Sequence, residues 1–273
     1  MEILTETTAY AGSIPVNYDL YLSSLLFEPY AADMLDRLKR LQPASLLELA
    51  CGTGILTRLL TAAFPDTPII ASDIHPDTIQ IARQKTREQI NLRWEVMDAA
   101  KLPLEDEQFG VVVCQFGVMF FKDKPEAFRE ALRVLKPGGT LIFSVWDDIN
   151  FNTACKLANN TVAKFFPENT PGFFELPYSY HDDYIIKRSL YAAGFREVDI
   201  AVVPLSGFSP SPADAAKGLL EGTPANTAIL ERNGQALPAM EAALAEELRM
   251  HFGQHNLHVP MQAKLVTAVK AGY

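Results

Sequence analysis

Short apolar runs alternate with segments of helical spacing from residue 45 to residue 146, and this alternation constrains the fold more than any other feature of the chain. The first run, Leu46–Ala50, leads into the glycine turn Cys51–Gly54, and Ile55–Phe64 then has helical spacing. Nearly continuous Val, Ile and Leu strands separated by helices are typical of a parallel sheet that is covered on both faces. The sequence therefore predicts an α/β fold with a doubly wound, mostly parallel sheet.

The remaining strands and helices follow from the same two periodicities. Together with Leu46–Ala50, the predicted strands are Pro68–Asp73, Asn91–Met97, Phe109–Cys114, Thr140–Trp146, Glu197–Val203 and Val259–Val269. The other predicted helices are Tyr18–Phe27, Tyr30–Leu41, His75–Arg87, Pro125–Leu135, Asp182–Ala193 and Pro238–Phe252. Lys136–Gly139 is predicted to be a turn, and Gly194 is predicted to end the helix before it. These elements predict a sheet of seven strands.

Two segments, 147–180 and 206–255, interrupt the alternation. The first is rich in aromatic residues between Phe151 and Tyr180, and the second is rich in Ala, Leu and Glu. A chain of 273 residues fits one domain with additions. We therefore expect a single domain over residues 1–273, with helical cap elements at 1–42, 147–180 and 206–255. The aromatic residues either form the core of this cap or line an apolar substrate pocket.

The charge balance and the cysteines narrow the choice of partner and compartment. There are 33 acidic against 24 basic residues, a formal net charge of -9, which disfavours nucleic acid and anionic membranes as partners. The segment Met1–Glu6 is acidic where a secretory signal is basic, and no apolar stretch reaches the roughly 20 residues of a membrane span. Three cysteines without a Cys-x-x-Cys pattern argue against disulfides and zinc. We expect a reduced, cytoplasmic protein.

The turn after the first strand carries the most informative chemistry. Glycines there let the backbone approach a nucleotide-like ligand, which in open parallel sheets binds outside the carboxyl ends of the strands. Asp73 ends the next strand and could accept two hydrogen bonds from a ribose diol, so an adenosine-containing ligand is predicted. A nicotinamide cofactor would require a third glycine, but Thr57 occupies that position. The chain also contains neither Tyr-x-x-x-Lys nor a Walker sequence.

Taken with later segments, this turn resembles the first motif of the class I S-adenosylmethionine-dependent methyltransferases. The resemblance is to the small-molecule type that includes ubiquinone and menaquinone biosynthesis enzymes, and it covers about residues 15 to 205. Arg133–Leu141 resembles the family's turn into the fifth strand, whereas Ala50 stands where the family more often has glycine. The resemblance implies a Rossmann-like fold and methyl transfer from S-adenosylmethionine to a small organic acceptor, hydrophobic or aromatic, through an O, N or C nucleophile. The product of the cofactor would be S-adenosylhomocysteine.

The resemblance also implies which residues bind the cofactor. They are Tyr18, Tyr21, Glu48, Ala50, Cys51, Gly52, Gly54, Asp73, Ile74, Met97, Asp98, Ala99, Gln115 and Phe116. Backbone amides around Gly52 would face the cofactor carboxylate at a helix N-terminus. Asp73 would bind the ribose and Asp98 the adenine amino group, between apolar walls from Ile74 and Ala99. Gln115 and Phe116 would lie along the methionine moiety, while Glu48 would order the turn.

No catalytic base is obvious from the residues. Methyl transfer needs alignment, exclusion of water and, for an oxygen or carbon acceptor, removal of a proton. His181 is the candidate base, with a surface or helix-capping histidine as the alternative. No metal site is expected from His251, His255 and His258, because the helix that holds the first of them should end at Gly253.

Other functions stay open at this point. They are a non-catalytic cofactor-binding module, an NAD-dependent oxidoreductase and a nucleic-acid methyltransferase; the last should show a basic groove. The protein is expected to act as a monomer or a homodimer.

Overall fold

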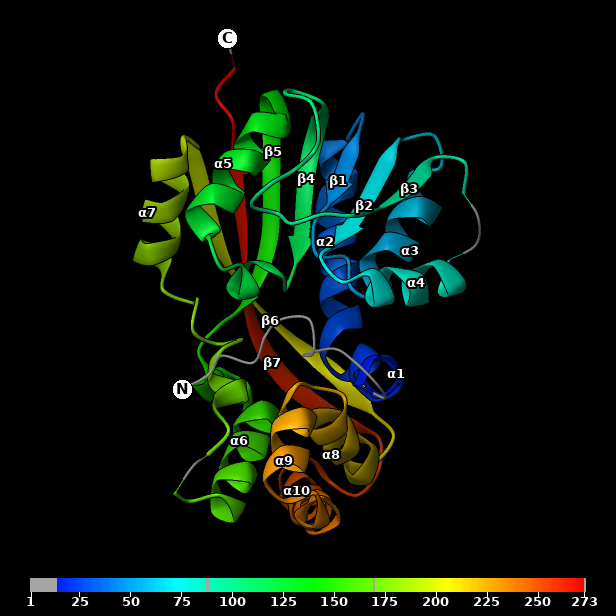
Figure 1. Cartoon of the computed structure of the whole chain (residues 1–273), viewed down its shortest axis with the longest axis vertical. Helices are drawn as coiled ribbons and strands as arrows, with labels where there is room; N and C mark the ends of the chain where they lie inside the picture. Colours follow the sequence, from blue (N-terminus) through cyan, green and yellow to red (C-terminus); the bar gives the residue numbers. More distant parts are fainter. Residues whose placement is uncertain (1–13, 87–88, 169, 273) are drawn as a thin grey trace. The chain divides into compact units, whose positions relative to one another are not determined.

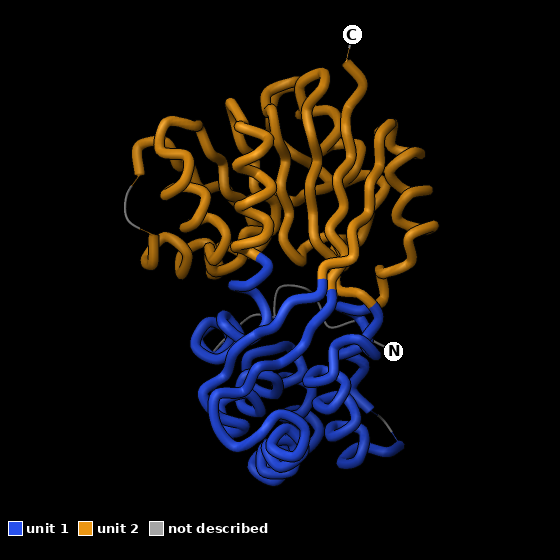
Figure 2. The backbone as a smooth tube through the Cα atoms, turned by 180° about the vertical axis from the view of Figure 1, so that it is seen from behind, with its two compact units in different colours: residues 1–30, 148–178, 204–262 blue, residues 31–147, 179–203, 263–273 orange. Residues whose placement is uncertain are grey.

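The computed structural model describes residues 14–86, 89–168 and 170–272. The expectations for residues 1–13 and for Arg87 lie outside these ranges. The chain forms two compact units, each assembled from segments that are distant in the sequence (Figure 2). Unit 1 comprises residues 1–30, 148–178 and 204–262, and unit 2 comprises residues 31–147, 179–203 and 263–273.

Unit 2 contains most of the predicted sheet, whose seven strands run in the order β3-β2-β1-β4-β5-β7-β6 (Figure 1). The strands are β1 Leu46–Glu48, β2 Ile69–Asp73, β3 Leu92–Val96, β4 Phe109–Gln115, β5 Leu135–Trp146, β6 Glu197–Ser209 and β7 Leu257–Val269. The pairs β1–β2, β1–β4, β2–β3 and β4–β5 are parallel, and β5–β7 is antiparallel. The predicted mostly parallel, seven-stranded α/β fold is thus confirmed.

Five of the described helices each lead into a strand of the sheet. They are α2 Glu28–Leu41, α3 Ile55–Ala63, α4 Pro76–Lys85, α5 Lys124–Val134 and α7 Asp183–Ala193. Local sequence explains the helix ends. Asp123 caps α5 by accepting from the Glu126 N–H, and Asp182 caps α7 in the same way. Gly194, with φ of 111°, ends α7 as predicted.

Strands β5 and β6 extend furthest beyond their predicted ends. Strand β5 begins at Leu135, so the predicted turn at Lys136–Gly139 lies inside a strand. Gly138, with φ of 75°, carries the backbone through an irregularity there, and its N–H donates to the Lys270 carbonyl at 3.1 Å. Strand β6 continues to Ser209, and therefore the first residues of segment 206–255 are extended rather than helical.

Unit 1 is a helical layer into which β6 and β7 both continue. Its helices are α1 Ile14–Asn17, the π-helical η2 Tyr18–Phe27, α6 Thr153–Phe165, α8 Pro212–Glu221, α9 Ala225–Asn233 and α10 Leu237–Phe252. Helix α8 packs against η2 and α10. A side chain at Gly218 would place its Cβ 2.7 Å from the Tyr21 Cβ, and one at Gly207 would meet the Leu25 carbonyl at 1.7 Å. Both glycines are therefore required by close packing against η2.

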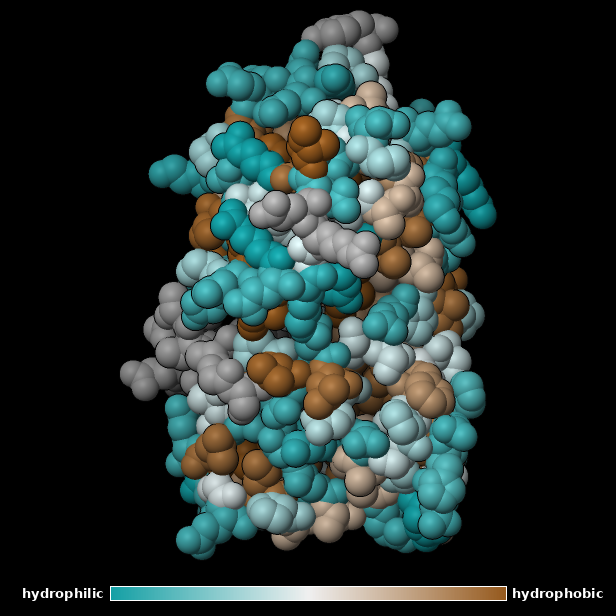
Figure 3. All heavy atoms as spheres, turned by 90° about the vertical axis from the view of Figure 1, so that its right-hand side faces the viewer, coloured by the Kyte–Doolittle hydropathy of each residue, from teal (hydrophilic) through white to brown (hydrophobic). Residues whose placement is uncertain are grey.

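None of the described helices is long and apolar enough to cross a membrane. On the face drawn in Figure 3, hydrophobic residues form small separate groups among hydrophilic ones. Isolated exposed apolar side chains of this kind are normal on a protein surface.

Candidate functional site

The carboxyl ends of β1, β2 and β4 meet at one edge of the sheet because these strands are parallel. The Leu49 N–H donates to the Val113 carbonyl at 2.8 Å, and the Cys51 N–H donates to the Ser72 carbonyl at 2.9 Å. These bonds hold the glycine turn between the ends of β2 and β4. We call the resulting surface the carboxyl edge; its residues are 48–54, 73–74, 97–99, 115–117 and Trp146. Parallel sheets bind ligands at this edge.

The backbone of the carboxyl edge is strained at two residues that are not glycine. Ala50 and Phe116 have φ of 51° and 53°, in the left-handed region. Such a conformation costs a residue with a Cβ about 1–2 kcal/mol. At Gly117 a Cβ would lie 2.5 Å from the Ala50 Cβ, so the ends of β1 and β4 approach closely. Strain of this kind concentrates at ligand sites, and the small side chain of Ala50 fits where the resemblance leads one to expect glycine.

Asp73 is buried at the carboxyl end of β2 and bonded to the backbone through both carboxylate oxygens. Its Oδ2 accepts from the Gly52 N–H and its Oδ1 from the His75 N–H, each at 2.9 Å. Burial raises the pKa of Asp73, and the two amides oppose that shift. Each oxygen can accept a second hydrogen bond, so the carboxylate can still bind a diol. The Gly52 N–H, which we expected to face a cofactor carboxylate, is instead used by Asp73.

Glu48 lies behind the turn, with only 1% of its surface exposed. The Thr57 hydroxyl donates to its carboxylate at 2.6 Å, which ties α3 to β1. Burial raises the pKa of Glu48 to about 8, opposed by the Thr57 hydrogen bond and assisted by the charge of Asp73. A hydroxyl thus occupies the position where a dinucleotide fold places its third glycine.

The segment expected to bind adenine lies beside Asp73, because the Met97 N–H donates to the Asp73 carbonyl at 3.1 Å. Asp98 is exposed, and its Oδ1 accepts from the Ala100 N–H at 2.9 Å. Ile74 is 46% exposed although it directly follows a buried strand. Ala99 is half-buried and Met97 is buried. An accessible carboxylate, Asp98, and an accessible aliphatic side chain, Ile74, thus follow the ends of β3 and β2.

The end of β4 is held against β5 and carries an aromatic pair. The Phe116 N–H donates to the Ser144 carbonyl at 3.1 Å, and the Phe116 ring stacks on Trp146 with ring centroids 4.0 Å apart. Gln115 is half-buried at the same strand end. Sequence reasoning missed Trp146, although it is the last residue of a predicted strand that ends at this edge.

Tyr18 and Tyr21 belong to unit 1. The Tyr18 ring stacks on Phe27 with a centroid distance of 4.6 Å, and the Lys217 ammonium lies 5.6 Å from the centre of the Tyr21 ring. Both are packing contacts within unit 1. The assignment of the two tyrosines to the cofactor site stays a prediction.

His181 lies in unit 2, directly before the residue that caps α7. Because Asp182 is the cap, His181 itself is not a capping histidine. Its carbonyl accepts from the Lys264 ammonium at 2.7 Å. Sequence reasoning missed Lys264 as well; the signal available was that it is the single charged residue of the predicted strand Val259–Val269. The role of His181 as a base stays a prediction.

The histidines in and after the end of α10 each make different contacts. Ring Nδ1 of His251 lies 2.8 Å from the Glu247 carbonyl, Gly253 ends the helix, and the His258 ring packs near Phe208. Within the described ranges, no group of three or more His, Cys, Asp or Glu residues is arranged to hold a metal ion.

Cys51, Cys114 and Cys155 are buried free thiols, and burial raises the pKa of Cys114 to about 12.

Comparison with known proteins adds a family to this geometry. A family model described as a methyltransferase domain matches residues 47–143, which include most of the carboxyl edge. The demethylmenaquinone methyltransferase of Deinococcus radiodurans is 39% identical over 101 residues, 37% of this chain and 42% of that protein. A ubiquinone/menaquinone biosynthesis C-methyltransferase of Idiomarina loihiensis is 29% identical over 169 residues, 56% of this chain and 66% of that protein. The chain thus spans less than two thirds of the length of these relatives.

A solved structure shares the fold over nearly the whole chain. It is phosphoethanolamine N-methyltransferase 2 of Haemonchus contortus in complex with S-adenosyl-L-methionine, with a TM-score of 0.59 at 17% identity, covering 97% of this chain and 58% of that one. The methyltransferase-domain match contains the glycine turn, Asp73 and the end of β4. Residues 47–143 of the chain therefore match a methyltransferase domain, and this part of the chain is similar to ubiquinone and menaquinone biosynthesis methyltransferases.

Proposed function

We propose that this protein transfers a methyl group from S-adenosylmethionine to a small organic acceptor and releases S-adenosylhomocysteine. The observation that carries the proposal is Asp73, held at the end of β2 by the amides of Gly52 and His75 and retaining hydrogen-bonding capacity for a ribose diol. The match of residues 47–143 to a methyltransferase domain supports it.

The residues of the carboxyl edge suit each part of the cofactor. Asp73 would bind the ribose hydroxyls, and Asp98 would accept from the adenine amino group, with Ile74, Met97 and Ala99 as apolar walls. The cofactor supplies a sulfonium-activated methyl group. The residues assigned to its methionine moiety are Ala50, Cys51, Gly52, Gly54, Gln115 and Phe116. Glu48 would act indirectly, by fixing the turn through Thr57.

The acceptor is proposed to be hydrophobic or aromatic. One relative is named for demethylmenaquinone and the other for ubiquinone and menaquinone biosynthesis. The Phe116–Trp146 stack, although buried, places two aromatic rings at the carboxyl edge. We further propose that the cap elements 1–42, 147–180 and 206–255, within a single functional domain, select the acceptor, and that Tyr18 and Tyr21 contribute from the first of them.

His181 is proposed as the base that removes the proton from an oxygen or carbon acceptor.

The net charge of -9 favours a small-molecule acceptor over nucleic acid. Three free thiols fit a reducing, cytoplasmic compartment. A monomer or a homodimer is proposed as the functional form.

Radiolabelled methyl transfer tests the activity. The protein is incubated with S-[methyl-³H]adenosylmethionine and a panel of reduced naphthoquinols, catechols and small amines, and labelled product is measured together with S-adenosylhomocysteine. We expect transfer to at least one apolar aromatic acceptor, with one S-adenosylhomocysteine formed per methyl group. Cofactor binding without transfer to any acceptor would favour the non-catalytic module, and binding of NAD in its place would favour the oxidoreductase that Thr57 argues against.

A pair of histidine variants tests the proposed base. His181→Ala should lower turnover of an oxygen or carbon acceptor about 100-fold, whereas His255→Ala, at an exposed residue of unit 1, should not. If both variants retain wild-type turnover, the assignment of His181 is wrong.

A further inference from the structure

Lys264 of strand β7 is almost completely enclosed by acceptors within unit 2. Its ammonium lies 2.6 Å from Oδ1 of Asp183, 2.7 Å from the His181 carbonyl and 3.5 Å from Oδ1 of Asp147. The Lys264 side chain is 12% exposed and that of Asp147 is 7% exposed. An ammonium has three donors, and these three acceptors account for all of them. We call this cluster the Lys264 tripod.

The strand register explains why these groups meet. Lys264 pairs with Val145 across the antiparallel β5–β7 ladder, and Asp147 follows two residues later on the chain of β5. Residues two apart on a strand share a face, so Lys264 and Asp147 are diagonal cross-strand neighbours. Asp183 is the first residue of α7. Burial opposes the charge of Lys264, but Asp183 and Asp147 outweigh it, so the pKa of Lys264 lies above its ordinary value.

The tripod also joins three places where the chain passes between its units. Asp147 is the last residue of unit 2 before the excursion 148–178 into unit 1, and His181 lies just after the chain returns. Lys264 is the second residue after the return from the excursion 204–262. The Lys264 side chain thus contacts the residues that flank segment 148–178 on both sides, and it lies just after the end of segment 204–262.

We propose that Lys264 is a positioning residue that fixes the 179–183 segment, and with it His181, at the end of β5. The proposal rests on the proposed function, in which His181 is the base at the carboxyl edge. Lys264 itself touches neither acceptor nor cofactor. It orders the segment by holding the His181 carbonyl and the first turn of α7, while Asp147 keeps its ammonium charged and oriented.

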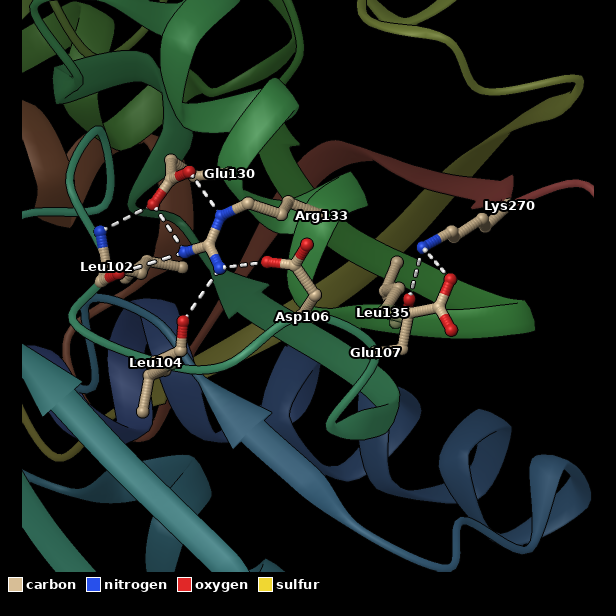
Figure 4. Close-up of polar contacts among 8 residues, drawn as sticks. All are labelled: Leu102, Leu104, Asp106, Glu107, Glu130, Arg133, Leu135 and Lys270. Carbon is tan, nitrogen blue, oxygen red and sulfur yellow. Dashed lines mark hydrogen bonds and ion pairs between the residues drawn. The ribbon is translucent and has the colours of Figure 1, made fainter.

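Lys270 provides a matched control further along the same chain. Its ammonium also donates to a carbonyl, that of Leu135 at 2.7 Å, and lies 3.4 Å from a carboxylate of Glu107. These partners lie at the amino end of β5, away from the carboxyl edge (Figure 4). Lys264→Met and Lys270→Met therefore remove the same kind of interaction from opposite ends of the paired strands. Lys264→Gln combined with Asp147→Asn removes the tripod without leaving a buried unpaired carboxylate.

The experiment measures acceptor turnover, S-adenosylhomocysteine affinity and amide hydrogen exchange in each full-length variant. For Lys264→Met and the double variant we expect kcat to fall about tenfold or more, as for small misplacements of a reacting group, with acceptor KM changed less than threefold. Affinity for S-adenosylhomocysteine should stay within about twofold, because the tripod contains no cofactor residue. Lys264→Arg should restore most of kcat, and Lys270→Met should leave it within twofold.

Hydrogen exchange separates this proposal from the proposed function. Amides of residues 180–185 should exchange at least tenfold faster in Lys264→Met and in the double variant, but not in Lys270→Met. If the wild-type protein transfers no methyl group, the proposed function fails, while the exchange data still test the tripod. Unchanged exchange at 180–185, or equal losses of kcat in Lys264→Met and Lys270→Met, would overturn the proposal.

Discussion

The two edges of the unit 2 sheet differ in how their charged groups are stabilised. At the amino edge, the Arg133 guanidinium donates to the carbonyls of Leu102 and Leu104 and to the carboxylates of Asp106 and Glu130 (Figure 4). This network lowers the pKa of Glu130, chiefly through the hydrogen bond from Arg133, and raises that of Arg133. Each charge there is stabilised by an opposite charge.

At the carboxyl edge, charge is penalised instead. Burial raises the pKa of Glu48 and of Asp73. Left-handed residues with a Cβ occur at both edges, Ala50 and Phe116 at this one and Gln42 and Glu107 at the amino edge, so the contrast lies in the carboxyl groups. Carboxyl groups with perturbed pKa values cluster at functional sites. The comparison indicates that the paired charges of the amino edge stabilise the fold. The buried carboxyl groups of the carboxyl edge lower the stability of the fold and suit a ligand site instead.

The largest expected effect is on cofactor affinity at the carboxyl edge. Asp73→Asn replaces the carboxylate that would accept a hydrogen bond from each of the two ribose hydroxyls. A hydrogen bond to a charged group contributes about 1.5–3 kcal/mol. We expect affinity for S-adenosylhomocysteine to fall at least ~100-fold in calorimetry. Asp106→Asn, at the amino edge, is the control and should bind normally. Equal affinities in the two variants would break the distinction between the edges, provided that circular dichroism shows both to be folded.

The next effect is on stability at the amino edge. Arg133→Met leaves the half-buried carboxylate of Glu130 without its cation, and we expect the free energy of unfolding to fall by about 2–3 kcal/mol. Arg129→Met breaks a more exposed ion pair with Glu126 and should cost less than about 1 kcal/mol. Urea unfolding measures both. A loss of S-adenosylhomocysteine affinity in Arg133→Met would contradict the assignment of this edge to stability.

Glu48 gives a smaller effect that depends on pH. Its folded pKa of about 8 exceeds the ordinary value of 4.5, so the folded protein binds more protons than the unfolded chain between these values. The free energy of unfolding should therefore fall as the pH rises, by about 2 kcal/mol between pH 5.5 and 7.5 from this group. Glu48→Gln should flatten the dependence in urea unfolding. Parallel pH profiles for variant and wild type would show that Glu48 is not the group responsible.

The smallest expected effect concerns backbone strain. Ala50→Gly relieves a left-handed alanine but makes the unfolded chain more flexible, so we expect stabilisation of at most about 1 kcal/mol. Gly138→Ala makes the reverse change at the amino edge, where φ is 75° and no atom lies within 4 Å of the added Cβ. We expect it to lower the free energy of unfolding by about 1 kcal/mol. Thermal unfolding measures both. Destabilisation by Ala50→Gly would show that strain at the carboxyl edge is negligible.

The strands of the sheet could be predicted from sequence because their apolar pattern is local. Gly194 and the glycine turn were also recognisable, since left-handed conformations favour glycine. Strand β6 was predicted to end too early, at Val203, because Pro204 and Gly207 resemble turn residues. The structure shows instead that Gly207 is required for packing against Leu25, a contact distant in sequence.

The parts of the site that escaped prediction all depend on tertiary pairing. Thr57 was recognised only as a missing glycine, because nothing local indicates its hydrogen bond to Glu48. The Lys264 tripod depends on the register between β5 and β7, which cannot be read from the pattern of either strand alone. The stacking of Trp146 on Phe116 likewise requires the parallel pairing of β4 with β5.

A crystal structure of the protein with S-adenosylhomocysteine tests the central claim most directly, because it locates the cofactor relative to both edges. We predict that the ribose hydroxyls lie within hydrogen-bond distance of the Asp73 carboxylate, with the adenine beside Asp98 and Ile74. Binding at the amino edge near Arg133, or a pose in which Asp73 touches no part of the ligand, would contradict the account.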